Sequence, residues 1–133
     1  MMQYPTIIDE MDSLKIMAYS LETVVAEKFQ TIVEKSTFNS RMKDFFDLFR
    51  IITAHNFDEV ILIDSIRATF MNRHTDFSAV EIVFSPEFMN DPTLDKRWIS
   101  FCKKSKIENP LSFKDIMDEI NSFIKPYCDK LKS

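Results

Sequence analysis

The chain has 133 residues and a formal net charge of −4, with 45% hydrophobic residues, enough to bury one core but too few for two domains. It contains no glycine, which excludes the glycine-rich loops that hold nucleotide phosphates in Rossmann and P-loop proteins. No apolar run approaches the roughly 20 residues of a membrane span, and acidic residues at 9, 10 and 12 interrupt any signal peptide; we expect a cytoplasmic protein without membrane contact.

The first element is expected to be a short strand. Residues 15–19 alternate weakly between polar and apolar side chains, and Pro5 and several acids before them are typical of a loop or a strand edge. We therefore expect residues 1–19 to be the edge of a preceding domain that is missing from this sequence. Residues 20–133 are expected to form the helical C-terminal domain.

Three helices are expected in the first half of the chain. Ser20 is a plausible N-cap for a helix over 20–35, and a second helix covers 41–55. A third helix begins at Asp58 and runs to residue 74. In each segment apolar residues recur three or four positions apart, which is the spacing of one buried helical face.

The second half is expected to be less regular. Pro86 and Pro92 predict an irregular stretch over 75–93, followed by a helix over 94–104. A last helix begins after Ser112.

Pro126 lies within that last helix, and the missing N–H of proline predicts a kink or an early end there. In total we expect a mainly α fold, a single domain over 1–133 built as a bundle of about five helices with a short N-terminal strand remnant.

Lys28 is the most informative residue of the first helix. At 100° per residue it falls within about 40° of the centre of the apolar face that Leu21, Val25 and Ile32 define. A lysine in that position either extends past its neighbours to reach water or is held by a carboxylate partner.

The second helix supplies candidate partners for Lys28. Asp44 and Asp47 are three residues apart and share one face, and helices joined by a short connection pack antiparallel. Arg41 opens this helix on its apolar side, whereas Lys43 is expected to point away. A lysine held among carboxylates suits a phosphate-binding site, although on these residues alone a structural ion pair is the more common arrangement.

A cluster of basic residues follows Asp95. Residues 96–106 contain no acidic residue and five basic ones: Lys96, Arg97, Lys103, Lys104 and Lys106. Such a cluster can contact the phosphate backbone of an RNA, although a run of charges is more often a solvated helix face. Cys102 and Cys128 lack the spacing of metal ligands, and we expect no metal site.

The segments 20–28 (SLETVVAEK) and 40–48 (SRMKDFFDL) together resemble the third signature block of the AbiEii nucleotidyltransferase toxins. That block has a Leu-Glu start, an Ala-Glu-Lys triplet, an Arg, a Lys-Asp or Arg-Asp pair and a closing Asp-Leu. A weaker similarity extends through 66–70 and 88–101. The resemblance therefore covers nearly the whole chain, although only residues 20–48 are specific.

The resemblance implies that Lys28 and either Asp44 or Asp47 belong to a nucleotide site, with Arg41 and Lys43 nearby. It also implies a polymerase-β-like N-terminal core, which supplies a Gly-Ser motif and paired carboxylates for Mg²⁺. This sequence has no glycine and thus no Gly-Ser motif. We therefore expect Mg²⁺ and NTP only in the full-length protein, and we expect the fragment to be inactive alone.

The family is that of type IV toxin–antitoxin and abortive-infection systems in bacteria. The resemblance implies an antitoxin that acts indirectly and transfer of a nucleotidyl group to an acceptor such as tRNA, which arrests growth. If the preceding domain is missing, apolar surface exposed on the first two helices would favour a homodimer. The alternative is a non-enzymatic helical module that contacts protein or RNA.

Overall fold

The structure is a computed structural model that describes residues 20–36 and 41–132. Within these ranges the chain forms seven α-helices, one 3₁₀ helix and no strand. In chain order these are α2 (Leu21–Glu34), α3 (Met42–Ala54), α4 (Glu59–Asn72), η1 (Phe77–Ala79), α5 (Val80–Phe84), α6 (Pro86–Met89), α7 (Pro92–Lys104) and α8 (Phe113–Lys132). The predicted mainly α class is confirmed, while the strand predicted at 15–19 lies outside the described residues.

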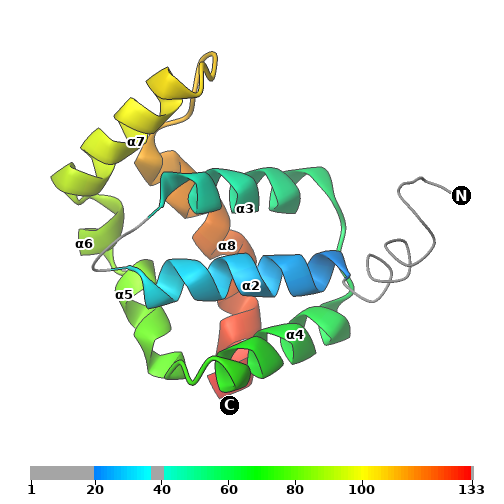
Figure 1. The fold of residues 1–133 in the computed structure, drawn as a ribbon. Helices are drawn as coiled ribbons and strands as arrows, with labels where there is room; N and C mark the ends of the chain where they lie inside the picture. Colours follow the sequence, from blue (N-terminus) through cyan, green and yellow to red (C-terminus); the bar gives the residue numbers. More distant parts are fainter. Residues whose placement is uncertain (1–19, 37–40, 133) are drawn as a thin grey trace, which may run out of the picture.

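Helices α2, α3 and α4 lie side by side, α8 crosses behind them, and α5, α6 and α7 follow along one side (Figure 1). Helix α3 runs antiparallel to α2, as the short connection between them predicts (Figure 1). The buried core is rich in phenylalanine: the ring of Phe29 in α2 lies 6.0 Å from that of Phe70 and 6.1 Å from that of Phe84. These contacts join α2 to α4 and α5.

The prediction of about five helices was wrong because the stretch 75–93 is helical. Ser85 accepts a hydrogen bond from the N–H of Phe88 and begins α6, with Pro86 as the first helical residue. Asp91 caps α7 in the same way, with Pro92 next. Proline is favoured at a first helical position, where its missing N–H would have no partner, so these two prolines start helices rather than interrupt them.

The prediction at Pro126 was wrong where it expected an early end, because α8 continues to Lys132. Ile124 and Cys128 are fully buried on either side of this proline. Pro126 itself is exposed, as is Ser122 four residues earlier, whose carbonyl loses its partner in the helix. Water can satisfy that carbonyl, and packing holds the helix together across the proline.

Turns in this glycine-free chain place other residues in the left-handed conformation. His74 after α4 has φ 53° and Lys106 after α7 has φ 56°. Each is followed by an N–H that bonds back over the helix end, from Thr75 to the Phe70 carbonyl and from Ile107 to the Cys102 carbonyl. This is the Schellman arrangement in which glycine usually stands, so Lys106 has a backbone role at the end of α7.

Large apolar side chains remain exposed at scattered positions of the described surface. Leu21 lies on α2, Val60 and Ile61 lie at the start of α4, and α3 carries none of them. A homodimer through apolar surface on the first two helices therefore stays a prediction. Within residues 20–36 and 41–132, none of the helices has the combination of length and apolar character that crossing a lipid bilayer requires.

Candidate functional site

Helix α2 holds Lys28 at the edge of the core. Ser20 caps the helix by accepting a hydrogen bond from the N–H of Thr23 at 3.2 Å. Val25, Phe29 and Ile32 are buried, whereas the side chain of Lys28 is 31% exposed. Lys28 therefore lies along the boundary between the apolar face and solvent, with its stem packed and its ammonium group accessible.

The two aspartates of α3 hold the ammonium group of Lys28. Lys28 Nζ lies 3.1 Å from Asp44 Oδ1 and 3.3 Å from Asp47 Oδ2, and donates a hydrogen bond to each. The side chain of Asp44 is 9% exposed and that of Asp47 is 24% exposed. The antiparallel packing of α2 and α3 brings the three residues together as the sequence predicts.

Arg41 and Lys43 complete the cluster from the start of α3; the expectation that Lys43 points away was wrong, because Asp47 lies one turn further along the same helix. Arg41 Nε donates to Asp44 Oδ2 at 3.1 Å, and Lys43 Nζ donates to Asp47 Oδ2 at 2.7 Å. We call Lys28, Arg41, Lys43, Asp44 and Asp47 the Lys28 cluster. Each carboxylate contacts two cations, and Lys28 is shared between them, so three cations face two carboxylates and the net charge is +1. The lysines and the arginine remain accessible to solvent.

The pairing shifts two pKa values within the cluster. Burial opposes the charged form of Lys28, but the hydrogen bonds and negative charges of Asp44 and Asp47 outweigh it and raise the pKa of Lys28 above 10.5. Burial likewise opposes ionisation of Asp47, but hydrogen bonds from Lys43 and Lys28 lower its pKa below 3.8. Both residues are therefore charged at neutral pH.

The lowered pKa of Asp47 predicts a pH-dependent contribution to stability. A carboxyl whose pKa is lower in the folded state stabilises the fold above its ordinary pKa of 3.8, and that stabilisation is lost as pH falls through the lowered value. We expect the difference in free energy of unfolding between the wild type and Asp47→Asn to shrink as pH falls below 3.8. Urea unfolding of both proteins between pH 7 and the acid limit measures this difference, and a constant difference would contradict it.

A pocket of about 330 Å³ adjoins the Lys28 cluster, between α2 and the second half of α3. Its lining includes Lys28, Asp47, Arg50, Ile51 and His55. The guanidinium carbon of Arg50 lies 5.6 Å from the centre of the Phe46 ring, a distance typical of a cation–π contact. The sequence prediction did not include Arg50, although its position three residues after Asp47 places both on one helical face.

Glu22 is a second residue that the sequence prediction left without a role. It is 8% exposed, and its Oε2 accepts a hydrogen bond from the backbone N–H of Asp58 at 2.7 Å. Asp58 in turn caps α4. Glu22 thus joins the starts of α2 and α4 and has a structural function within the Leu-Glu start of the signature block.

The described residues do not fit a magnesium site. Mg²⁺ binds oxygen ligands in a near-octahedral arrangement, and no group of three or more His, Cys, Asp or Glu side chains in residues 20–36 and 41–132 is arranged to hold a metal ion. Asp44 and Asp47 are each engaged by two cations. Their positive neighbours favour an anionic ligand instead.

The structure divides the basic residues of 96–106 between different surfaces. Lys96, Arg97 and Lys104 line a groove beside the start of α3, whereas Lys103 lines an apolar pocket between α7 and the loop before α8. Lys106 stands in the turn that ends α7. The five residues therefore do not form one continuous surface.

A model of the protein family described as nucleotidyl transferase AbiEii toxin, type IV toxin–antitoxin system, matches residues 1–119. No curated protein and no solved structure matches the chain. The match covers most of the 133 residues and includes the whole Lys28 cluster. The chain therefore belongs to the AbiEii family of nucleotidyltransferase toxins of type IV toxin–antitoxin systems.

Proposed function

We propose that this chain supplies the Lys28 cluster to the nucleotide site of an AbiEii-type toxin. The complete toxin transfers a nucleotidyl group from an NTP to a hydroxyl acceptor, such as the end of a tRNA, and thereby arrests growth. The single observation that carries this proposal is the cluster itself, in which the three cations outnumber the two carboxylates beside a solvent-open pocket.

Lys28 is proposed to bind the phosphates of the NTP. Its ammonium group has three N–H donors, of which one is directed to Asp44 and one to Asp47. The third donor remains for a ligand in the adjoining pocket, which Lys28 lines. Nucleotidyl transfer forms a bond from the acceptor oxygen to the α-phosphorus and releases pyrophosphate, and a fixed positive charge stabilises the developing negative charge.

The two aspartates are proposed to have different tasks. Asp44 is nearly buried and uses both carboxylate oxygens, one for Lys28 and one for Arg41, so it positions Lys28. Both ion pairs of Asp47 use Oδ2, and we assign its Oδ1 to a hydrogen bond from the acceptor hydroxyl. Because its lowered pKa makes Asp47 a weak proton acceptor, this bond orients the hydroxyl.

The chain alone is proposed to be inactive. Its described carboxylates do not fit a magnesium ion, and the family resemblance places the metal-binding carboxylates in an N-terminal core. That core is the proposed partner of the Lys28 cluster.

Lys28→Met separates this function from a purely structural ion network. Asp44 keeps Arg41 and Asp47 keeps Lys43 in this variant, so neither carboxylate is left without a cation. We expect the free energy of unfolding to change by no more than about 1 kcal/mol, and nucleotidyl transfer by the complete toxin to be lost. Urea unfolding measures the first quantity, and incorporation of an α-³²P-labelled NTP into RNA measures the second.

The alternative, a non-enzymatic helical interaction module, differs in the incorporation result. It predicts that Lys28→Met preserves or raises stability, and that neither the wild type nor the variant of the complete protein incorporates label. Incorporation by both proteins at equal rates would contradict the proposed role of Lys28.

A further inference from the structure

A groove of about 430 Å³ lies between the start of α3 and one face of α7. It is lined by Met42 of α3 and by Lys96, Arg97, Ser100, Phe101 and Lys104 of α7. We call it the α3/α7 groove. Within residues 20–36 and 41–132, the charged side chains that line it are all cations, although the chain as a whole has a net charge of −4.

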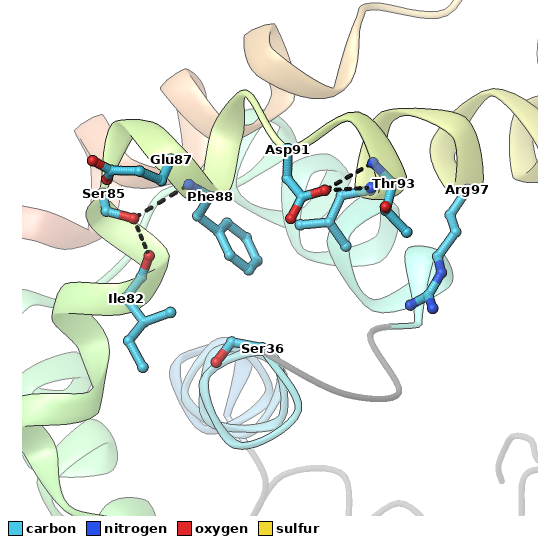
Figure 2. Close-up of a pocket in the computed structure, with 9 residues that line it drawn as sticks. Ser36, Ile82, Ser85, Glu87, Phe88, Asp91, Thr93 and Arg97 are labelled. Carbon is cyan, nitrogen blue, oxygen red and sulfur yellow. Dashed lines mark hydrogen bonds between the residues drawn. The ribbon is translucent and has the colours of Figure 1, made fainter.

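Helix α7 separates its charges between its faces. Asp95 and Lys103 line the apolar pocket on the other side of the helix. Asp91 caps the helix start and, with Glu87 of α6, lines a neighbouring hollow. Figure 2 shows Arg97 at the end of that hollow farthest from Glu87. The carboxylates of Glu87 and Asp91 therefore repel a polyanion from the hollow beside α6. The cations of α7 attract it into the α3/α7 groove, which Arg97 also lines.

The cations of the groove are spaced along the helix. Lys96 and Lys104 are eight residues apart, which at 1.5 Å per residue separates their Cα atoms by about 12 Å. Neither forms an ion pair with another residue in the described part of the chain. Two separated charges of this kind fit two different phosphates of an extended strand better than one compact anion.

Helix α3 contributes to both the groove and the Lys28 cluster. Met42, the first residue of α3, contributes to the groove lining and stands between Arg41 and Lys43 in the sequence. These two neighbours contact Asp44 and Asp47, which hold Lys28. Arg41 and Lys43 do not line the groove themselves, but both flank its lining residue Met42 in the chain and both belong to the Lys28 cluster.

An aromatic ring distinguishes this groove from a plain cationic patch. Phe101 is half-buried among the basic residues and packs against the rings of Phe46, at 5.9 Å, and Trp98, at 5.6 Å. Sites for single-stranded nucleic acid combine cations along the backbone with aromatic rings against the bases. An acidic peptide would use the charges of the groove without needing this ring.

We propose that the α3/α7 groove binds the sugar–phosphate backbone of a single-stranded RNA segment. The identification of that segment as the acceptor strand rests on the proposed function, since the groove would lead its end to Lys28 and Asp47. The binding itself does not depend on transfer and is measurable with this chain.

The test is the salt dependence of binding to a short single-stranded RNA, measured by fluorescence anisotropy. Lys96→Ala/Lys104→Ala removes two groove cations, and Lys103→Ala/Lys125→Ala removes two exposed lysines that do not line the groove. Both variants have the same net charge. Each phosphate contact on a single strand contributes a slope of about −0.7 in log K against log salt, so the groove variant should lose about 1.4 units of slope.

If the groove variant and the wild type bind equally at 1 M salt, this difference in slope makes the variant bind about 25-fold more weakly at 0.1 M salt. The control variant should bind like the wild type. The proposal would be overturned if both variants lost RNA affinity equally, or if binding by the wild type did not depend on salt. Displacement of the RNA by polyglutamate at equal charge concentration would overturn the assignment to nucleic acid.

These outcomes are separable from the proposed function. If Lys28→Met and the wild type incorporate label equally while RNA binding follows the groove variants, the groove proposal stands and the role of Lys28 is wrong. If transfer depends on Lys28 but RNA binding does not depend on Lys96 and Lys104, the role of Lys28 stands and the groove proposal is wrong.

Discussion

Replacement of Lys28 by alanine is expected to abolish growth arrest by the complete toxin. The Lys28 ammonium group is the only cation of its cluster that contacts both Asp44 and Asp47, and it borders the adjoining pocket. Removal of one preorganised donor to a developing negative charge typically lowers the rate by about 10²–10³-fold. Growth curves after induced expression, together with transfer of labelled nucleotide by the purified toxin, measure this effect.

The matched control is Lys114→Ala, which removes an exposed lysine near the start of α8 that does not belong to the cluster. It should arrest growth as the wild type does. Equal expression and equal thermal unfolding of Lys28→Ala would exclude misfolding, since Asp44 and Asp47 retain Arg41 and Lys43 as partners. Unchanged toxicity of Lys28→Ala would remove Lys28 from the site.

Phe29→Ala is expected to lower the free energy of unfolding by about 3–5 kcal/mol. Phe29 is fully buried, and its ring contacts Phe70 of α4 and Phe84 of α5. Alanine in this place removes the apolar area that holds three helices together and leaves a cavity that the surrounding helices fill only in part. The loss is a large share of the 5–15 kcal/mol that a domain of this size typically has.

Urea unfolding of this chain, followed by circular dichroism, measures the loss. Met71→Ala serves as the control because Met71 is 69% exposed on the last turn of α4, and its replacement should change stability by no more than about 0.5 kcal/mol. A loss of less than 1 kcal/mol for Phe29→Ala would show that α2 is not held by this core.

The long helices could be predicted because their apolar residues follow the helical period. The predicted segments 20–35, 41–55 and 58–74 lie within two residues of α2, α3 and α4 at each end. Ser20 is the cap that the sequence indicates, and Asp58, where the sequence places the start of the third helix, caps α4. The short helices α5 and α6 could not be predicted in this way, since five and four residues are too few to show a period.

The core of the candidate site was also predictable from periodicity. Lys28 falls near an apolar helical face, where a charge requires a partner, and Asp44 and Asp47 share the face of the next helix. The short connection makes the two helices antiparallel neighbours. Which aspartate pairs with Lys28 could not be predicted, because the pairing depends on the axial offset between α2 and α3. In the structure Lys28 pairs with both aspartates.

The amino-acid sequence was thus sufficient for the helical class, the family resemblance and the proximity of Lys28 to Asp44 and Asp47, all of which depend on local spacing. The tertiary structure was needed for the roles of residues that are distant in sequence or adjacent on one helix. Lys103 and Lys104 are neighbours in the chain, yet they line different surfaces because α3 packs against only one face of α7. The continuation of α8 past Pro126 likewise depends on burial at Ile124 and Cys128, since long-range packing can outweigh a local penalty that periodicity alone predicts.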